Sequence, residues 1–382
     1  MKKETYLHEV ELGLFDLAED LRKDIIHGCE IEYDALMEDG YTEEQIIEEL
    51  GTPEKVIERS LDTYGPKPGP QEISLFPKLT ASLAYAFKQF QMGSYVDKVE
   101  KYFTTSGMTE IPLDHLVDEL IIDGGKRPVN VYIRSGELLQ YRLEPNDADV
   151  SPKMKVTMDD TAMTLRPTGG KLILTLFIPN SIERIVVKTG GNVYCSKLCA
   201  DNIILEKSNK STYIDHCRIG ALRAVCTSSD TYISNSRFSM LDVQAKSGDV
   251  QVEKSEGTVF ISTKSGDVKI CDHSGEKCTV STGSGDIIVN SDFSILQLSA
   301  NSGDIVIRDN SVLEILAAST SCGDISCWLN DHVFTAEIFC KHGEFHNHTF
   351  LPVERLEKQH YRLGSGQASV ALTTKNGDIS IH

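Results

Sequence analysis

Polar and apolar residues repeat in a fixed pattern over the C-terminal half of the chain. A phrase such as Ser247-Gly248-Asp249 is followed by apolar residues two and four positions after its glycine, and preceded by others five and seven positions before it. Residues that alternate in this way share one face of a strand, so each repeat contains two short strands. The inward pairs after the glycine are Val250 and Val252, Val268 and Ile270, Ile287 and Val289, Ile305 and Ile307, Ile325 and Cys327, and Ile379 and Ile381.

The repeats recur with a nearly constant period of about 18 to 20 positions, which is typical of solenoid proteins. Equivalent positions are Gly191, Lys210, Ser229, Gly248, Gly266, Gly285, Gly303, Gly323 and Gly343, and Gly377 follows after a longer step. One repeat cannot bury its own apolar pairs, but stacking at about 4.8 Å per rung forms parallel sheets around a continuous interior. The sequence predicts a parallel β-solenoid (β-helix) over residues 111–382, with irregular leading strands over 111–170 and an insertion around 352–366.

Residues 1–64 have helical periodicity instead. Apolar residues recur every three or four positions from Leu7 to Ile25, Thr42 and Gln45 have the spacing of a capping box, and Thr52-Pro53 opens a further helix. The pattern predicts a small bundle of three or four helices, and the fold class is therefore α+β multidomain.

Residues 65–70, Gly-Pro-Lys-Pro-Gly-Pro, predict a linker because proline and glycine disfavour regular structure. Residues 75–90 then have the spacing of a nearly uncharged amphipathic helix. We interpret residues 65–110 as a linker and a helix that caps the solenoid, with a membrane-binding or partner-binding helix as the alternative.

The negative charge of the chain is concentrated near its start. The formal net charge is −19, and residues 1–64 hold 6 Lys and Arg against 19 Asp and Glu. A polyanionic segment repels phosphate groups and anionic lipids, which disfavours binding to nucleic acid or to a membrane surface. A protein partner with a basic surface is expected instead.

Neither a secretory signal nor a run of apolar residues long enough for membrane insertion is visible, so a cytoplasmic location is expected. The ten cysteines include no C-x-x-C pair, which disfavours a zinc knuckle or a dithiol redox motif. Cys195, Cys278 and Cys327 fall on inward rung positions and are interpreted as core residues.

Residues 40–56, Gly-Tyr-Thr-Glu-Glu-Gln-Ile-Ile-Glu-Glu-Leu-Gly-Thr-Pro-Glu-Lys-Val, resemble the HAAS signalling domain of Gram-positive bacteria. The resemblance extends over residues 1–64 and implies a regulatory or adaptor module. The repeated Ser-Gly-Asp phrase and the segment 174–189 resemble the bacterial putative-adhesin β-solenoid family. The two-part layout is similar to LiaX-type envelope-stress proteins.

Stacked rungs would align a column of carboxylates, formed by Asp249, Asp267, Asp286, Asp304 and Asp324. Like charges about 5 Å apart need relief from a cation or from local hydrogen bonds. The chain lacks the Gly-Gly-x-Gly-x-Asp pattern of calcium-binding rolls, which favours hydrogen bonds over calcium. Alternating His342, Glu344, His346 and His348 could present metal ligands from one strand face, and the alternative is a set of surface histidines beside the insertion.

Some solenoids cleave carbohydrates with carboxylates that gather in a groove, but a regular column suits repetition better. The chain has no G-x-S-x-G elbow, phosphate-binding glycine loop or H-E-x-x-H helix. The sequence predicts no enzyme, no catalytic residue and no cofactor.

Two functions remain open. The first is a regulatory scaffold in envelope-stress or transcriptional signalling, whose acidic module docks a protein partner such as a regulator. Its solenoid would offer a surface for binding or for homo-oligomerisation. The second is a cell-surface adhesin or polysaccharide-binding protein that is exported by an unrecognised route.

Overall fold

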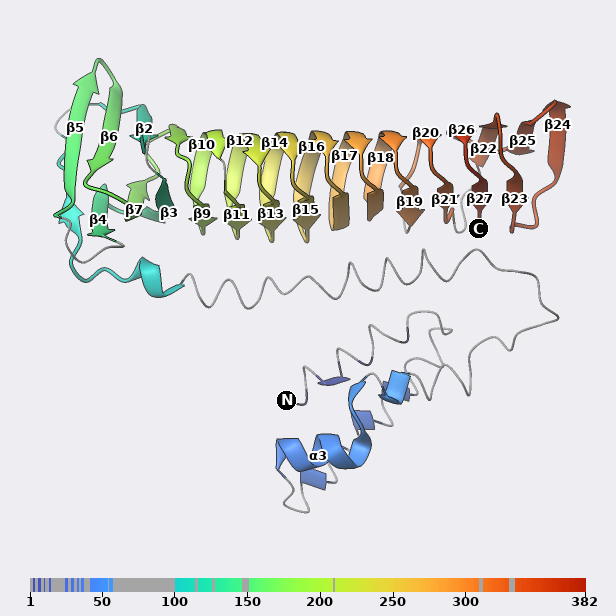
Figure 1. Cartoon of the computed structure of the whole chain (residues 1–382), viewed down its shortest axis with the longest axis horizontal. Helices are drawn as coiled ribbons and strands as arrows, with labels where there is room; N and C mark the ends of the chain where they lie inside the picture. Colours follow the sequence, from blue (N-terminus) through green and yellow to red (C-terminus); the bar gives the residue numbers. More distant parts are fainter. Residues whose placement is uncertain are drawn as a thin grey trace. The chain divides into compact units, whose positions relative to one another are not determined.

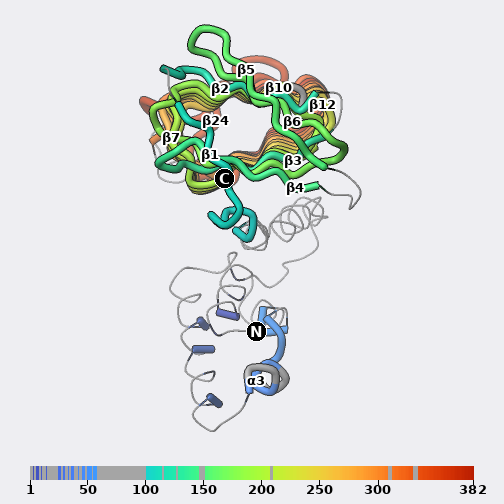
Figure 2. The backbone as a smooth tube through the Cα atoms, turned by 90° about the vertical axis from the view of Figure 1, so that its left-hand side faces the viewer, coloured from blue at the N-terminus to red at the C-terminus, as the bar shows by residue number. Residues whose placement is uncertain are grey.

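The solenoid is a stack of rungs, and most rungs in its middle part consist of one short and one long strand (Figure 1). The computed structural model describes residues 100–382 apart from 114–115, 126–127, 146–150, 209, 309–311 and 330–333; before residue 100 it describes 42–53, 55–57 and scattered positions between 3 and 37. Residues 91–382 form one unit and residues 1–90 another. Figure 2 looks along the coil and shows the rungs overlaid in one ring.

In the middle of the solenoid each strand pairs in parallel with its equivalent one period later. The short strands are β9 (Val193–Ser196), β11 (Thr212–Asp215), β13 (Thr231–Ser234) and β15 (Val250–Glu253). The long strands are β8 (Arg184–Lys188), β10 (Cys199–Ser208), β12 (Arg218–Ser228), β14 (Arg237–Ser247) and β16 (Glu256–Ser265). β17 (Val268–Ser284) and β18 (Ile287–Ser302) join both strands of a rung, and β19 (Ile305–Arg308) follows.

The second strand of a middle rung is longer than the sequence pattern predicted. β10, β12, β14 and β16 span 10 or 11 residues, because the chain stays extended through the stretch that precedes the second apolar pair. The prediction of two short strands per rung therefore holds only for the strand that follows the glycine.

Two turns give each rung its shape. Between the short and the long strand lies a left-handed residue, with φ from 46° to 52° at Lys197, His216, Asn235, Lys254 and Asp272. The other turn contains the glycine of the Ser-Gly-Asp phrase. At Gly303 φ is 143°, and a Cβ atom would lie 2.0 Å from the carbonyl oxygen of Gly285. Only glycine fits such an approach between stacked backbones.

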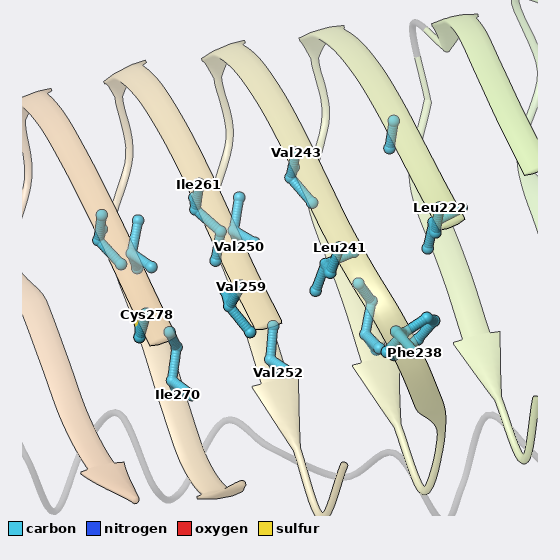
Figure 3. Close-up of a cluster of buried hydrophobic side chains, with 14 of the residues drawn as sticks. Leu222, Phe238, Leu241, Val243, Val250, Val252, Val259, Ile261, Ile270 and Cys278 are labelled. Carbon is cyan, nitrogen blue, oxygen red and sulfur yellow. The ribbon is translucent and has the colours of Figure 1, made fainter. Parts of the chain in front are cut away.

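The interior of the middle rungs is mainly apolar, with Thr212 and Thr231 at two of the inward positions. Val250, Val252, Val259 and Ile261 are at most 3% exposed, and Figure 3 shows them projecting from successive rungs into one cluster. Cys195, Cys278 and Cys327 belong to the same core, which confirms their interpretation as buried residues. Burial raises the pKa of the Cys278 thiol well above its ordinary value.

At the C-terminal end the order of rungs in space departs from their order in the sequence. β26 (Ala368–Asn376) and β27 (Ile379–Ile381) pair on one side with β20 (Ile315–Cys322) and β21 (Ile325–Cys327). On the other side they pair with β22 (Phe334–Cys340) and β23 (Phe345–Asn347). Placing the Gly343 rung directly after the Gly323 rung was therefore wrong, because the last segment of the chain enters between them.

The predicted insertion forms a hairpin beyond this end. β24 (Val353–Glu357) and β25 (His360–Gly364) pair antiparallel, and β25 also pairs antiparallel with β22. The hairpin extends the sheet of long strands by two antiparallel strands.

The N-terminal end is built in the same way. β2 (Glu119–Asp123) and β3 (Val129–Gly136) lie between the middle rungs and a rung made of β6 (Ala162–Thr168) and β7 (Leu172–Pro179). Outside that rung, β5 (Lys153–Asp159) pairs antiparallel with β6, and β4 (Gln140–Pro145) with β7. β1 (Thr109–Glu110) pairs with β4. These are the irregular leading strands expected over residues 111–170.

Residues 100–110 pack on the first rungs. The 3-10 turn η1 (Lys101–Phe103) places Phe103 against Tyr132 and Phe177. The Arg142 guanidinium donates to the carbonyl oxygens of Tyr102 and Thr104. This stretch is part of the solenoid unit rather than a free linker.

In the N-terminal unit, α3 (Glu43–Leu50) begins with the predicted capping box of Thr42 and Gln45. A buried cluster joins α3 to earlier residues, formed by Tyr6, Val10, Leu14, Tyr33 and Ile46. The linker 65–70 and the helix 75–90 lie outside the described residues. The other predicted helices are described only at scattered positions, so the helical bundle and the cap stay predictions. No helix in the part of the chain described has the length and apolar character needed to cross a bilayer.

Candidate functional site: the stacked columns of the solenoid exterior

The structure stacks the five predicted aspartates in one column, at the turn that starts each short strand. The Oδ1 atom of each carboxylate accepts a hydrogen bond from the backbone N–H of the acidic residue one rung on, for example from Asp304 to Asp286 at 2.8 Å. The chain of bonds also takes in Asp230, Asp378 and Glu344 at the ends. The donor–acceptor distances are 2.7 to 3.0 Å throughout.

Hydrogen bonds between rungs therefore reach every carboxylate that the sequence picked out. Burial, assisted by neighbouring carboxylates, raises the pKa of Asp249, Asp286 and Asp304 above the ordinary value. The column thus combines a stabilising backbone bond at each rung with electrostatic repulsion along its length. The hydrogen bonds of the column therefore link each rung to the next.

The four residues 342, 344, 346 and 348 do not share one strand face. His342 lies in the turn before β23, which begins only at Phe345. The His346 and His348 rings lie side by side with centroids 6.5 Å apart; His346 Nε2 is 3.8 Å from Asp378 Oδ2, and the His348 ring stacks on His382 with centroids 4.5 Å apart. Among the residues that the structure describes, no group of three or more His, Cys, Asp or Glu side chains is arranged to hold a metal ion.

A ladder of tyrosines runs along the outward face of the first short strands, and sequence reasoning missed it. The rings of Tyr102, Tyr132, Tyr194, Tyr213 and Tyr232 stack in that order, with neighbouring centroids 4.3 to 5.1 Å apart. The last hydroxyl, on Tyr232, donates to Asp230 Oδ2 at 3.2 Å and so connects the ladder to the aspartate column. The signal was present, because Tyr194, Tyr213 and Tyr232 follow one another at the period of the repeat.

Ionic contacts fix the start of this tyrosine ladder. Glu100 accepts hydrogen bonds from Arg134 at 2.7 Å and from Lys197 at 3.0 Å, and these bonds lower the pKa of its carboxyl group to about 2. The Arg134 guanidinium also lies 4.0 Å from the centroid of the Phe103 ring. Residues 100–103 are thereby held to the first rungs.

A second stack closes the other end of the short-strand face. Arg308 lies 4.3 Å from the Trp328 ring, Trp328 stacks on His382 at 4.3 Å, and His382 stacks on His348. Burial, and then the nearby His348 and Arg308, lower the pKa of His382 to about 4. At neutral pH this stack contains a neutral His382, which suits ring stacking.

The exterior columns are therefore ordered by contacts between rungs. Backbone N–H groups bind the aspartates, and ring stacking aligns the aromatic residues. These columns present a regular surface, with tyrosine rings over the first rungs and carboxylates over the later rungs.

Comparisons with known proteins agree with both parts of the chain. A family model described as Toastrack DUF4097 matches residues 129–382, and one described as HAAS matches residues 5–59. A search of curated proteins found no match.

Three solved structures of bacterial proteins are similar to this chain at low sequence identity. One is a putative cell adhesion protein from Clostridium sporogenes, with 10% identity, 72% of this chain and 96% of that chain covered, and a TM-score of 0.20. A putative adhesin from Bacteroides fragilis has 13% identity, with 73% of this chain and 98% of that chain covered and a TM-score of 0.31. A putative adhesin from Parabacteroides distasonis has 12% identity, with 72% of this chain and 96% of that chain covered and a TM-score of 0.34.

Proposed function

Because the chain belongs to the Toastrack DUF4097 family and carries a HAAS segment, we propose that it is a non-catalytic regulatory scaffold of bacteria that acts through protein–protein contacts. In this proposal the HAAS segment docks a partner in envelope-stress or transcriptional signalling. The solenoid supplies a long rigid surface.

The observation that carries the proposal is the charge of the HAAS segment. Residues 1–64 hold 19 acidic against 6 basic residues, and the family match covers 5–59. A surface of this charge attracts a basic protein surface and speeds its encounter at low ionic strength. We expect the partner to present lysines and arginines to this segment.

The solenoid supports the same proposal through the state of its carboxylates. A catalytic pair needs two carboxyl groups in different environments around one substrate. The column instead repeats one environment, in which each carboxylate accepts the N–H of the next rung. Such repetition suits a structural and binding role.

The test is a pull-down from the native host with the full chain and with a variant that lacks residues 1–64. We expect a discrete partner that is lost with the deletion and whose capture weakens as salt is raised. A circular dichroism spectrum that keeps the strand signal shows that the solenoid of the deletion variant is folded. Equal recovery by both proteins contradicts the proposal.

A cell-surface adhesin or polysaccharide-binding protein is the competing proposal. Surface protease treatment of intact cells separates the two, because an intracellular scaffold stays uncut. Cleavage of the chain on intact cells, with a cytoplasmic marker intact, favours the adhesin.

A further inference from the structure

The sheet of long strands ends in an unpaired edge at each end of the solenoid. Within the described residues, β5 pairs only with β6, and β24 pairs only with β25. Between these edges the sheet runs through β6, β2, β8, β10, β12, β14, β16, β17, β18, β20, β26, β22 and β25. Each edge therefore presents a row of backbone donors and acceptors that can accept another strand.

Both edge strands expose apolar side chains. On β5, Val156 and Met158 are 40% and 42% exposed, and on β24, Val353 and Leu356 are 43% and 37% exposed. Phe350, just before β24, is fully exposed. At both ends the neighbouring side chains Met154 and Leu351 pack against the solenoid core, so the exposed residues continue that core past the last rung.

The two edges carry opposite charge. The β5 strand has exposed Lys153 and Lys155 with one acid, Asp159, whereas β24 has exposed Glu354 and Glu357 with one base, Arg355. Opposite charges directly across a strand pair stabilise it, so the two edges are complementary in charge. Contact between β5 and β24 pairs lysines with glutamates.

Strand direction is compatible with the mixed pair. The β5 strand runs antiparallel to β6, so it runs against the parallel strands of the solenoid. β24 is antiparallel to β25, which is antiparallel to β22, so β24 runs with them. When two copies follow one another in the same orientation, β24 of one and β5 of the next are antiparallel, the more favourable arrangement for a new ladder.

We propose that the solenoid associates head to tail with a second copy of this chain by antiparallel pairing of β24 with β5. The inference goes beyond the proposed function, since it needs no partner other than the chain itself. Because the contact joins two different surfaces, it leaves one free edge at each end of any oligomer and extends into a linear assembly.

Sedimentation velocity of the full chain over a range of concentrations tests the proposal. The wild type should show dimers and longer species that grow with concentration and diminish at high salt. The Val156→Lys and Val353→Lys variants each place a charge in the contact, and each should sediment as a monomer. Met240→Lys is the matched control, because Met240 is 43% exposed on β14 in the middle of the solenoid, and it should assemble like the wild type.

Mixing the two variants distinguishes head-to-tail pairing from other contacts. The Val156→Lys chain keeps its β24 edge and the Val353→Lys chain keeps its β5 edge, so the mixture should form a discrete dimer that does not extend. A wild type that stays monomeric at every concentration overturns the proposal, and so does dimerisation of either folded variant alone. Neither result affects the pull-down, which reports on residues 1–64.

Discussion

The middle of the solenoid and its two ends follow different rules of assembly. In the middle, each rung pairs with the rungs that precede and follow it in the sequence, as β12 does with β10 and β14. At each end, the terminal segment of the solenoid enters one rung inside the last, so that β26 separates β20 from β22 and β2 separates β6 from β8. Local repetition thus builds the middle, whereas the ends depend on pairing between segments distant in the sequence.

This difference between the middle and the ends affects how the rungs form. A middle rung can form as soon as its neighbour is in place, because only one repeat of the chain must be ordered at each step. The C-terminal rung must bring β26 back past the hairpin and between two existing rungs. The ends therefore close with non-local contacts, which cost more chain entropy to form.

Removal of residues 367–382 should have the largest effect on the structure, and it tests the C-terminal end of the solenoid separately from the middle. The variant loses β26 and β27, and with β26 the parallel neighbour of β22, whereas β20 keeps its parallel pairing with β18. We expect amide hydrogen exchange protection to fall to nearly zero in β22 and β25 and to remain unchanged from β9 to β18. Retained protection in β22 would mean that it pairs directly with β20, in the order of the sequence, and would contradict the intercalated arrangement.

Substitution of two glycines should have the next largest effect on stability. One glycine lies in the middle of the solenoid and the other near its N-terminal end, so their costs can be compared. Gly303→Ala places a Cβ atom 2.0 Å from the Gly285 carbonyl oxygen, at a positive φ, and should destabilise the solenoid by about 4 kcal/mol. Gly125→Ala near the N-terminal end also meets a positive φ of 65°, but it has open space around it. Its cost should be about 1 to 2 kcal/mol.

Urea unfolding of both glycine variants measures the difference. A similar cost at the two positions would show that backbone strain, and not the close stacking of glycines, sets the requirement at the turn.

The sequence pattern predicts the middle of the solenoid well because one physical requirement repeats there. Val250, Val252 and their equivalents must face the interior, and this requirement appears as alternation at a fixed period. The capping box of Thr42 and Gln45 was equally visible, since it depends on two residues three apart. Local patterns of this kind report local structure.

The order of the end rungs could not be derived in the same way. Every rung presents the same alternating edge, so the patterns around Gly343 and Gly377 are both compatible with a place beside the Gly323 rung. Only the pairing of β26 with both neighbours decides between them. The tyrosine ladder was missed for another reason, because the period was sought in inward positions and Tyr194, Tyr213 and Tyr232 face outward.

Substitution of two separate cysteines should have a smaller effect on stability, and it tests the core near the middle of the solenoid. Cys278→Ser puts a hydroxyl group into a fully buried apolar position and should cost about 2 kcal/mol. Cys322→Ser restores the usual serine of the Ser-Gly-Asp phrase at an exposed position and should change stability by less than about 0.5 kcal/mol. Equal costs, measured by thermal unfolding under reducing conditions, would contradict the inward assignment of Cys278.

Changes in the aspartate column should have the smallest effect on the free energy of unfolding. The direction of its pH dependence differs between the middle and the start of the solenoid. Because the folded-state pKa of Asp286 is raised above its ordinary value of 3.8, its contribution to stability is fully present below 3.8 and is lost as pH rises through the raised pKa. Glu100 at the start has the opposite sign. Its pKa is lowered from 4.5 to about 2, so its contribution is present above 4.5 and is lost as pH falls toward 2.

Asp286→Asn removes the charge and keeps an oxygen that accepts the N–H of Asp304. We expect a variant that is slightly more stable than the wild type at pH 7, by less than about 1 kcal/mol, and equal to it near pH 3.8. Asp286→Ala is the matched control, because it removes both the charge and the acceptor and should be less stable than Asp286→Asn at every pH. Urea unfolding from pH 3.5 to 7 measures the stability of all three proteins. If Asp286→Asn is less stable than the wild type at pH 7, the charge of Asp286 strengthens its hydrogen bond to the next rung by more than the repulsion between neighbouring carboxylates costs.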